Sequence, residues 1–206
     1  MLQLQAVNTK LLELLNKIMA VEAFDNFVLV GGTSLALQEG HRLSIDIDLF
    51  GNSPIDEFEF TEILKEFGKA VILRKSPNII IYSIDGIKVD FVNYQYPLIE
   101  EAILEDNIRL ASKKDIAAMK LNAISGRGSK KDFIDLALLL NTYSLREMMS
   151  FYKQKYQDGS EFLVIKSLTY FEDADNEPMP VMLINESWDD VKKKVIHATE
   201  DYLNTI

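Results

Sequence analysis

The sequence predicts an α+β protein, with strands concentrated in the first half of the chain and helices in the second. Two observations support this prediction. Before residue 95, short apolar runs rich in β-branched residues are bounded by glycine or by Asp-Gly, whereas from about residue 100 every periodic segment has helical spacing. We therefore expect one unit over residues 1–98 and a second, helical unit over residues 99–206.

The composition is that of an ordinary soluble globular protein, with 48% hydrophobic and 26% charged residues in a chain of 206. The chain has no cysteine, which excludes a disulfide framework, a thiolate metal site and a thiol nucleophile. It shows neither a signal-peptide pattern nor an apolar run of membrane-spanning length, so we expect a cytoplasmic protein without a membrane partner. A net charge of −10 argues against a generic nucleic-acid coat protein, although an acidic body is compatible with a basic active-site mouth.

The first elements predict a phosphate-binding turn. Residues 3–20 carry apolar side chains at helical spacing, which predicts an amphipathic first helix, and residues 27–30 read as a short buried strand. The next two residues are Gly31 and Gly32, where the backbone can turn sharply and a ligand can approach closely. Thr33 and Ser34, which follow them, are typical N-cap residues for a helix. A strand, a glycine turn and a helix N-terminus aim N–H groups and a positive dipole end at one spot, which suits a phosphate.

A second strand carries two acids. Residues 45–50 alternate with period two, which places Asp46 and Asp48 together on one face. Strand interiors disfavour aspartate, and the two like charges repel one another, so a bound cation would relieve the repulsion. Hard carboxylate oxygens on a rigid strand suit Mg²⁺. The alternative is a solvated edge strand on which the acids only discourage aggregation.

The following stretch predicts a helix over residues 56–69, a strand near 71–73 and a β-hairpin whose arms are 79–84 and 87–92. Asp85-Gly86 between the arms is the strongest short-range hairpin signal.

The second hairpin arm adds a third acid. Asp90 lies on the face opposite to the arm's apolar residues. If this arm lies beside residues 45–50 in the sheet, Asp90 completes a triad of carboxylates. The alternative is a solvent-facing aspartate on a hairpin.

The second half of the chain has four Ser-x-x-Asp or Ser-x-x-Glu patterns that resemble capping boxes, before predicted helices near 113–125, 130–141, 145–156 and 188–204. A further helix is predicted over 160–171, and the acidic, proline-bearing residues 172–180 read as a loop.

Basic residues are concentrated at the start of this half. Six of the 22 basic residues fall between positions 113 and 131, among them Lys120 and Arg127. Asp132 and Asp135 are separated by three residues on the next predicted helix and are therefore neighbours. Lys120 is either a phosphate ligand in a cleft or a surface lysine, and Asp135 is either catalytic or the simple partner of a nearby cation.

Several motifs, in this order, resemble the AbiEii/AbiGii toxin family, a branch of the polymerase-β-like nucleotidyltransferases. They are GGTSL at 31–35, HRLSIDIDLF at 41–50, KVDFV at 88–92, DIAAMK at 115–120 and RGSKKDFIDL at 127–136. The resemblance implies a nucleotidyltransferase-like mixed sheet with flanking helices, followed by a helical half that completes the active site.

The resemblance also implies an activity. Members transfer an NMP from an NTP to an acceptor hydroxyl with Mg²⁺ and release pyrophosphate. Characterised relatives include toxins of type IV toxin–antitoxin, abortive-infection-like systems that modify the 3′ end of tRNA and are neutralised by an antitoxin protein.

The resemblance assigns roles to residues of this chain. Those expected to be catalytic are Asp46, Asp48, Lys120 and Asp135. The carboxylates expected to hold Mg²⁺ are Asp46 and Asp48, with Asp90 matching the superfamily's third acid. The residues expected to contact the nucleotide are Gly31, Gly32, Thr33, Ser34, Arg42, Lys120 and Arg127, where Arg42 either contacts phosphate or braces the loop. Lys120 would offset charge on the leaving pyrophosphate, and Asp135 would position or deprotonate the acceptor hydroxyl.

Two other functions use the same residues. A metal-dependent nuclease would activate water at the acid cluster and degrade a polymer without NTP. A catalytically silent module would bind a nucleotide or an antitoxin partner. The sequence does not identify the NTP, the acceptor, an antitoxin or the oligomeric state.

Overall fold

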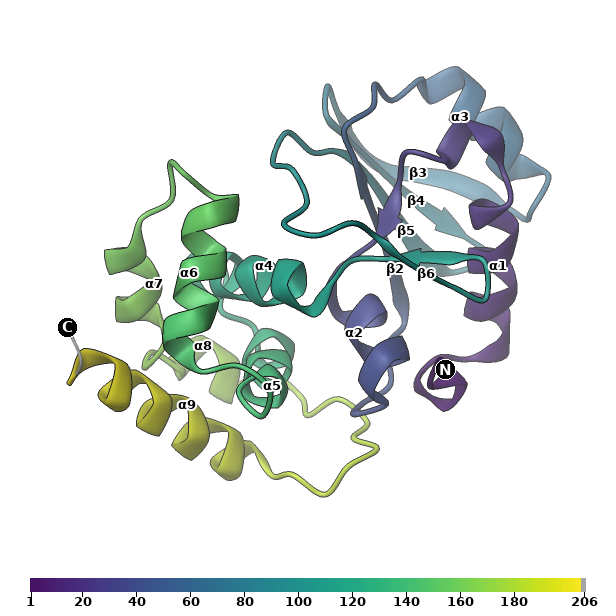
Figure 1. Cartoon of the computed structure of the whole chain (residues 1–206). Coiled ribbons are helices and arrows are strands. Elements are labelled where there is room, and N and C mark those ends of the chain that lie inside the picture. The colour runs from purple at the N-terminus through teal and green to yellow at the C-terminus, as the bar shows by residue number, and fades with distance from the viewer. Residues whose placement is uncertain (205–206) are drawn as a thin grey trace. The chain divides into compact units, whose positions relative to one another are not determined.

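The computed structural model describes residues 1–204 and separates the chain into two units, Met1–Ala111 and Ser112–Ile206. Within the described residues, the first unit holds one seven-stranded sheet in the order β3-β4-β5-β2-β1-β7-β6 (Figure 1). The strands are β1 Val28–Leu29, β2 Asp46–Gly51, β3 Ala70–Ser76, β4 Ile79–Ile84, β5 Ile87–Asn93, β6 Ile103–Glu105 and β7 Ile108–Leu110. The helices of this unit are α1 Thr9–Met19, α2 Gly31–Glu39 and α3 Glu57–Lys65, with single 3₁₀ turns at Leu4–Ala6 and Glu22–Phe24.

The sheet is mixed. β2 runs parallel to β5 and antiparallel to β1, and β1 in turn runs parallel to β7. The hairpins β3–β4, β4–β5 and β6–β7 are antiparallel. β2 is thus a central strand with a partner on both sides, which excludes the solvated edge strand as an explanation of its two aspartates. Residues 94–102 leave the end of β5 and connect it to β6 near the far edge of the sheet.

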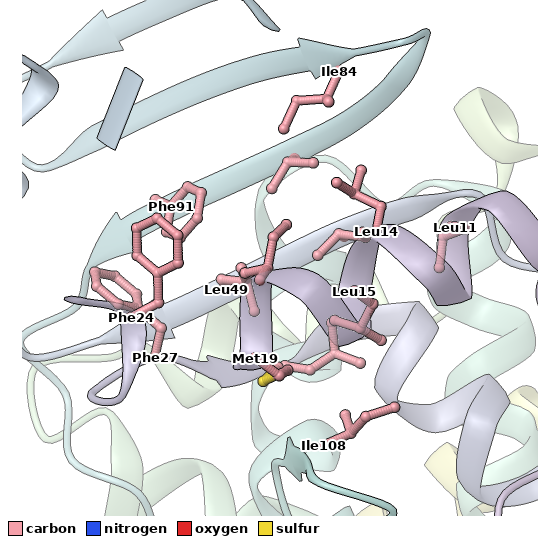
Figure 2. Packing of buried hydrophobic residues seen from close by; sticks show 14 of the residues in the cluster. Leu11, Leu14, Leu15, Met19, Phe24, Phe27, Leu49, Ile84, Phe91 and Ile108 are labelled. Atoms are coloured by element: carbon pink, nitrogen blue, oxygen red, sulfur yellow. The ribbon is translucent and has the colours of Figure 1, made fainter. Parts of the chain in front are cut away.

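Helix α1 packs its leucines against one face of the sheet, as Figure 2 shows for Leu11, Leu14 and Leu15. The same core holds four phenylalanine rings at centroid distances between 4.8 and 5.8 Å, contributed by Phe24, Phe27, Phe60 and Phe91. Burying each such side chain contributes about 1.5–3 kcal/mol, so this face of the sheet supplies much of the unit's stability.

The predicted hairpin is confirmed. Asp85 and Gly86 have φ angles of 48° and 87°, so both lie in the left-handed region that a two-residue type I′ turn requires. β3 is longer than the predicted strand near residues 71–73, and α3 begins after Asp56, whose side chain accepts from the amide of Glu59 at 2.9 Å.

The first helix is shorter than predicted. Residues 3–20 were expected to be helical, but α1 begins at Thr9, because the side chain of Asn8 caps it by accepting from the amide of Leu11 at 2.8 Å. Val7, predicted to lie on the helix, instead pairs with Ser44 in an isolated bridge.

The second unit consists of helices within its described part. They are α4 Lys113–Gly126, α5 Lys130–Leu139, α6 Leu145–Lys155, α7 Glu161–Ser167, α8 Glu172–Asp175 and α9 Trp188–Leu203. Complete capping boxes form before α6 and α9, at Ser144 and Ser187. Ser129 accepts no capping hydrogen bond, and its hydroxyl donates to the carboxylate of Asp132 at 2.7 Å.

The α+β class is confirmed, with two corrections to the predicted elements. β6 and β7 fall in the stretch that was predicted to be entirely helical, and the short helix α8 falls in the predicted loop 172–180. Arg109 on β7 donates hydrogen bonds of 3.0 Å to three carbonyl oxygens, that of Met19 at the end of α1 and those of Phe24 and Phe27 between α1 and β1. This side chain ties the short strand pair β6–β7 to the rest of the sheet. None of the described helices has the length and hydropathy of a membrane span.

Candidate active site

The start of helix α2 brings the glycine turn against a carboxylate. Val30 is extended, Gly31 has φ +66°, and α2 begins at Gly31 without a side-chain cap. A Cβ on Gly31 would lie 2.8 Å from Oδ2 of Asp48. Glycine is therefore favoured here, because of its backbone angle and because a Cβ would displace the carboxylate of Asp48. Thr33 and Ser34 were expected at the N-cap, but this prediction is wrong, because both lie inside the helix and Val30 is at the N-cap.

The same turn holds the backbone of strand β2, which carries Asp46 and Asp48. The amide of Val30 donates to the carbonyl of Asp48 at 2.9 Å, and the hydroxyl of Thr33 donates to the carbonyl of Asp46. The Thr33 hydroxyl also lies 2.7 Å from that of Ser44. The side chains of Thr33 and Ser34 are buried, so they serve the fold, and their contact with a nucleotide stays a prediction.

Asp46 and Asp48 occupy the sheet face opposite to the phenylalanine core. Both are partly exposed, and they alternate with the buried Ile47 and Leu49. Ile45 was expected to face the core with Ile47, but it is 63% exposed, because the strand begins only at Asp46.

The predicted neighbourhood of the third acid is confirmed. β2 and β5 are parallel and in register, so Asp48 lies opposite Asp90, and Asp46 lies opposite Lys88. The ammonium of Lys88 is 2.6 Å from the carboxylate of Asp90. The period of two predicts Lys88 and Asp90 on one face, and the structure adds that the two form an ion pair.

The two partly exposed aspartates fit a Mg²⁺ ion. Mg²⁺ in nucleotide-binding sites is commonly held by one or two carboxylates together with phosphate oxygens of the substrate. Within residues 1–204 no three His, Cys, Asp or Glu side chains are grouped to hold a metal ion, so the described protein alone offers a pair of carboxylates rather than a triad. A role for Asp90 as a metal ligand stays a prediction.

The second unit contains a buried cluster of opposite charges. Nζ of Lys120 lies 2.6 Å from Asp135 and 3.0 Å from Asp132, and Lys120 is 5% exposed. The structure thus excludes a surface lysine at position 120. Arg127 and Ser129 complete the cluster by donating to Asp132, with Nε of Arg127 at 2.8 Å.

The cluster keeps Asp132 ionised. Burial by itself would raise the pKa of Asp132, but the charges of Lys120 and Arg127 and the hydrogen bonds from Arg127 and Ser129 outweigh it and hold the pKa well below its ordinary value. The predicted contacts of Lys120 and Arg127 with a nucleotide, and the catalytic role of Asp135, stay predictions.

Arg42 is buried and donates from Nη1 to the carbonyl of Leu43 at 3.1 Å, a contact that braces the loop before β2. Its contact with phosphate stays a prediction. The second unit holds a second buried ion pair that was not predicted, Lys155 with Asp115 at 2.7 Å, and both side chains are fully buried. Because 40 residues separate the two partners, no local pattern reveals this pair.

Comparison with known proteins identifies relatives along almost the whole chain. The model of the family described as "Nucleotidyl transferase AbiEii toxin, Type IV TA system" matches residues 13–205. An uncharacterised protein of Aquifex aeolicus, aq_aa25, is 36% identical over 197 residues, which cover 93% of this chain and 95% of that protein.

Solved structures share the fold at low sequence identity. JHP933 from Helicobacter pylori superposes with a TM-score of 0.60 at 15% identity, covering 95% of this chain and 90% of that one. The nucleotidyltransferase toxin MenT4 of Mycobacterium tuberculosis gives a TM-score of 0.58 at 15% identity, covering 93% and 82%. ANT(2″)-Ia in complex with adenylyl-2″-tobramycin gives 0.56 at 16% identity, covering 73% and 99%. With the match over residues 13–205, the chain belongs to the AbiEii family, the nucleotidyltransferase toxins of type IV toxin–antitoxin systems.

Proposed function

We propose that this chain transfers an NMP from an NTP to an acceptor hydroxyl in a Mg²⁺-dependent reaction. We further propose the 3′ end of a tRNA as the acceptor, the cytoplasm as the location, and an antitoxin protein as the partner that neutralises the activity. The observation that carries the proposal is the contact between Gly31 at the start of α2 and the carboxylate of Asp48, beside Asp46 on the same face.

In the proposed reaction, the acceptor oxygen forms a bond to the α-phosphorus of the NTP while the bond to pyrophosphate breaks. Asp46 and Asp48 would hold Mg²⁺, which supplies a Lewis acid that neutralises charge on the phosphates. The backbone at Gly31 and Gly32 would receive the triphosphate, because a helix N-terminus favours anions and glycine permits their close approach.

Each of the two units is proposed to contribute different residues to the reaction. Met1–Ala111 would be the nucleotidyltransferase core that holds the metal and the triphosphate. From the second unit, Lys120 would offset the charge that develops on pyrophosphate. The buried contact of 2.6 Å between Lys120 and Asp135 supports a role of Asp135 in orienting the lysine, besides its proposed action on the acceptor hydroxyl.

The test is incubation of the full chain with each NTP labelled at the α-phosphate, with Mg²⁺ and total tRNA. The double variant Asp46→Asn/Asp48→Asn is compared with Asp106→Asn, the same chemical change in an exposed turn between β6 and β7. We expect label on RNA with the wild type and with Asp106→Asn, and none with the double variant or with excess EDTA.

Each other result excludes the proposal in a different way. RNA cleavage without NTP would support a nuclease. Absence of label on both RNA and protein, with all NTPs, would exclude tRNA as the acceptor and would support either a different acceptor or a silent binding module.

A further inference from the structure

We propose that Phe50, Tyr94 and Tyr96, named here the ring cluster, form a stacking site for a nucleobase next to the proposed triphosphate site. This inference rests on the proposed function, and it concerns residues to which the family resemblance assigns no role. The ligand chemistry is a planar heteroaromatic base, which either the NTP or the acceptor RNA can supply.

The ring cluster continues the face that carries the acids. On β2, Phe50 follows Asp46 and Asp48 with the same period of two residues. On β5 the corresponding positions are Lys88, Asp90 and Val92, with Val92 opposite Phe50. The amide of Tyr94 donates to the carbonyl of Gly51 at 2.8 Å, so Tyr94 extends the pairing of the two strands by one more step.

The three rings are in contact with one another. The centroids of Phe50 and Tyr94 lie 4.8 Å apart with an interplanar angle of 54°, and those of Tyr94 and Tyr96 lie 5.3 Å apart at 62°. All three residues are partly exposed. The phenylalanine core, in contrast, is fully buried on the opposite face, so the ring cluster is not a part of it.

The position of the cluster suits a base whose phosphates lie at α2. β2 and β5 run parallel, so at the same end of both strands the acids are followed by Phe50 on β2 and by Val92, then Tyr94, along β5 and just beyond it. Strand geometry places the Cα of Phe50 about 6.6 Å beyond that of Asp48, and the carboxylate of Asp48 lies against Gly31 at the start of α2. A separation of this size corresponds to the ribose that joins a base to its α-phosphate.

Stacking also has a predictable strength. Removal of one aromatic side chain from a base-stacking site weakens binding by about 5- to 150-fold, and the effect depends little on the base because every base has a π-face. We therefore expect the ring cluster to strengthen binding of all NTPs, or of any unpaired RNA end, without selecting strongly among bases.

The test compares ligands with and without a base. Isothermal titration of the full chain, with Mg²⁺ present, measures the affinities for ATP, for CTP and for inorganic tripolyphosphate, and fluorescence anisotropy measures that for a labelled single-stranded RNA oligonucleotide. The variant is Tyr94→Ala, with Tyr94→Phe to keep the ring. Tyr143→Ala serves as the matched control, because Tyr143 is a partly exposed residue of the second unit whose ring also packs on a neighbour, Phe151.

If the NTP base binds the ring cluster, Tyr94→Ala weakens ATP and CTP binding by about 5- to 150-fold and leaves tripolyphosphate unchanged, while Tyr94→Phe and Tyr143→Ala bind as wild type. If the acceptor base binds there, the same loss occurs with the RNA oligonucleotide instead.

Equal affinities of Tyr94→Ala and wild type for all ligands would overturn the inference. If the wild type binds neither tripolyphosphate nor NTP, the proposed triphosphate site is contradicted. The affinities of the wild type and Tyr94→Ala for the RNA oligonucleotide then test the ring cluster by themselves. Absence of binding to every ligand would overturn both.

Discussion

Substitution of Gly31 by alanine should have a small effect on the stability of the fold and a large effect on activity. The alanine Cβ would lie 2.8 Å from Oδ2 of Asp48, and φ at this position is +66°. Holding an L-residue in the left-handed region costs about 1–2 kcal/mol. The carboxylate is the free end of a side chain, so it can retreat, and reaching an ordinary contact of 3.4 Å requires a movement of about 0.6 Å.

A shift of this size is small for stability and large for catalysis, because a misplacement of about 1 Å can lower a rate about 100-fold. We expect Gly31→Ala to lose about 1–2 kcal/mol of stability, to lower kcat/KM roughly 10- to 100-fold and to require more Mg²⁺ for half-maximal activity.

The matched control is Gly86→Ala in the β4–β5 turn. Gly86 has φ +87°, but a Cβ there would have no heavy atom within 4 Å. It should lose a similar amount of stability, seen as a fall in Tm of about 2–8 °C per kcal/mol, and keep its activity once folded. The assay is labelled-NMP transfer at several Mg²⁺ concentrations, below the Tm of both variants. Two results would refute the argument that this position is glycine in order to admit Asp48. One is wild-type activity in Gly31→Ala, and the other is an equal loss of activity in Gly31→Ala and Gly86→Ala.

Three further predictions concern the buried charges of the second unit. Lys120→Met leaves the carboxylates of Asp132 and Asp135 without their shared cation, so it should lower the free energy of unfolding by about 3–5 kcal/mol. Urea unfolding measures this loss, and a midpoint urea concentration equal to that of the wild type would contradict it. Because the pKa of Asp132 is lowered on folding, its ionisation stabilises the fold fully above pH of about 4–5, and this contribution declines as the pH falls below about 4. Urea unfolding of Asp132→Asn should therefore depend less on pH between about 3 and 5 than that of the wild type. Lys155→Met should cost about 3–5 kcal/mol, and adding Asp115→Leu should recover part of this loss, whereas strict additivity in the double-mutant cycle would show that the pair is not coupled.

The sequence predicted those parts of the fold that local patterns encode. Asp85-Gly86 specified the hairpin, and the alternation around Asp46 and Asp48 placed both acids on one face before any strand partner was known. The alternation of residues 87–92 likewise placed Asp90 on the correct face. Its position beside Asp48, however, depends on the pairing of two strands about 40 residues apart, which no local pattern contains.

The errors have equally physical causes. β6 and β7 have three residues each, too few to show a period of two, and their place in the sheet depends on Arg109 and on β1. The start of α2 was placed too late because Thr33 has the chemistry of a cap, yet its hydroxyl bonds to the neighbouring strand instead.

The course of residues 94–102 has a consequence for how this family can diversify. The segment leaves β5 and reaches β6 four strand positions away, a distance of about 19 Å, whereas an extended chain of its length spans about 30 Å. Beyond Tyr94 it contributes no strand to the sheet, so its slack can absorb substitutions and insertions without shifting the register of Asp48 against Asp90. The part of the segment beyond Tyr94, which includes Tyr96, thus lies outside the paired strands that hold the acids. Selection can exchange the surface beside the carboxylates, and with it the molecules that are recognised, while the chemistry of the strand stays fixed.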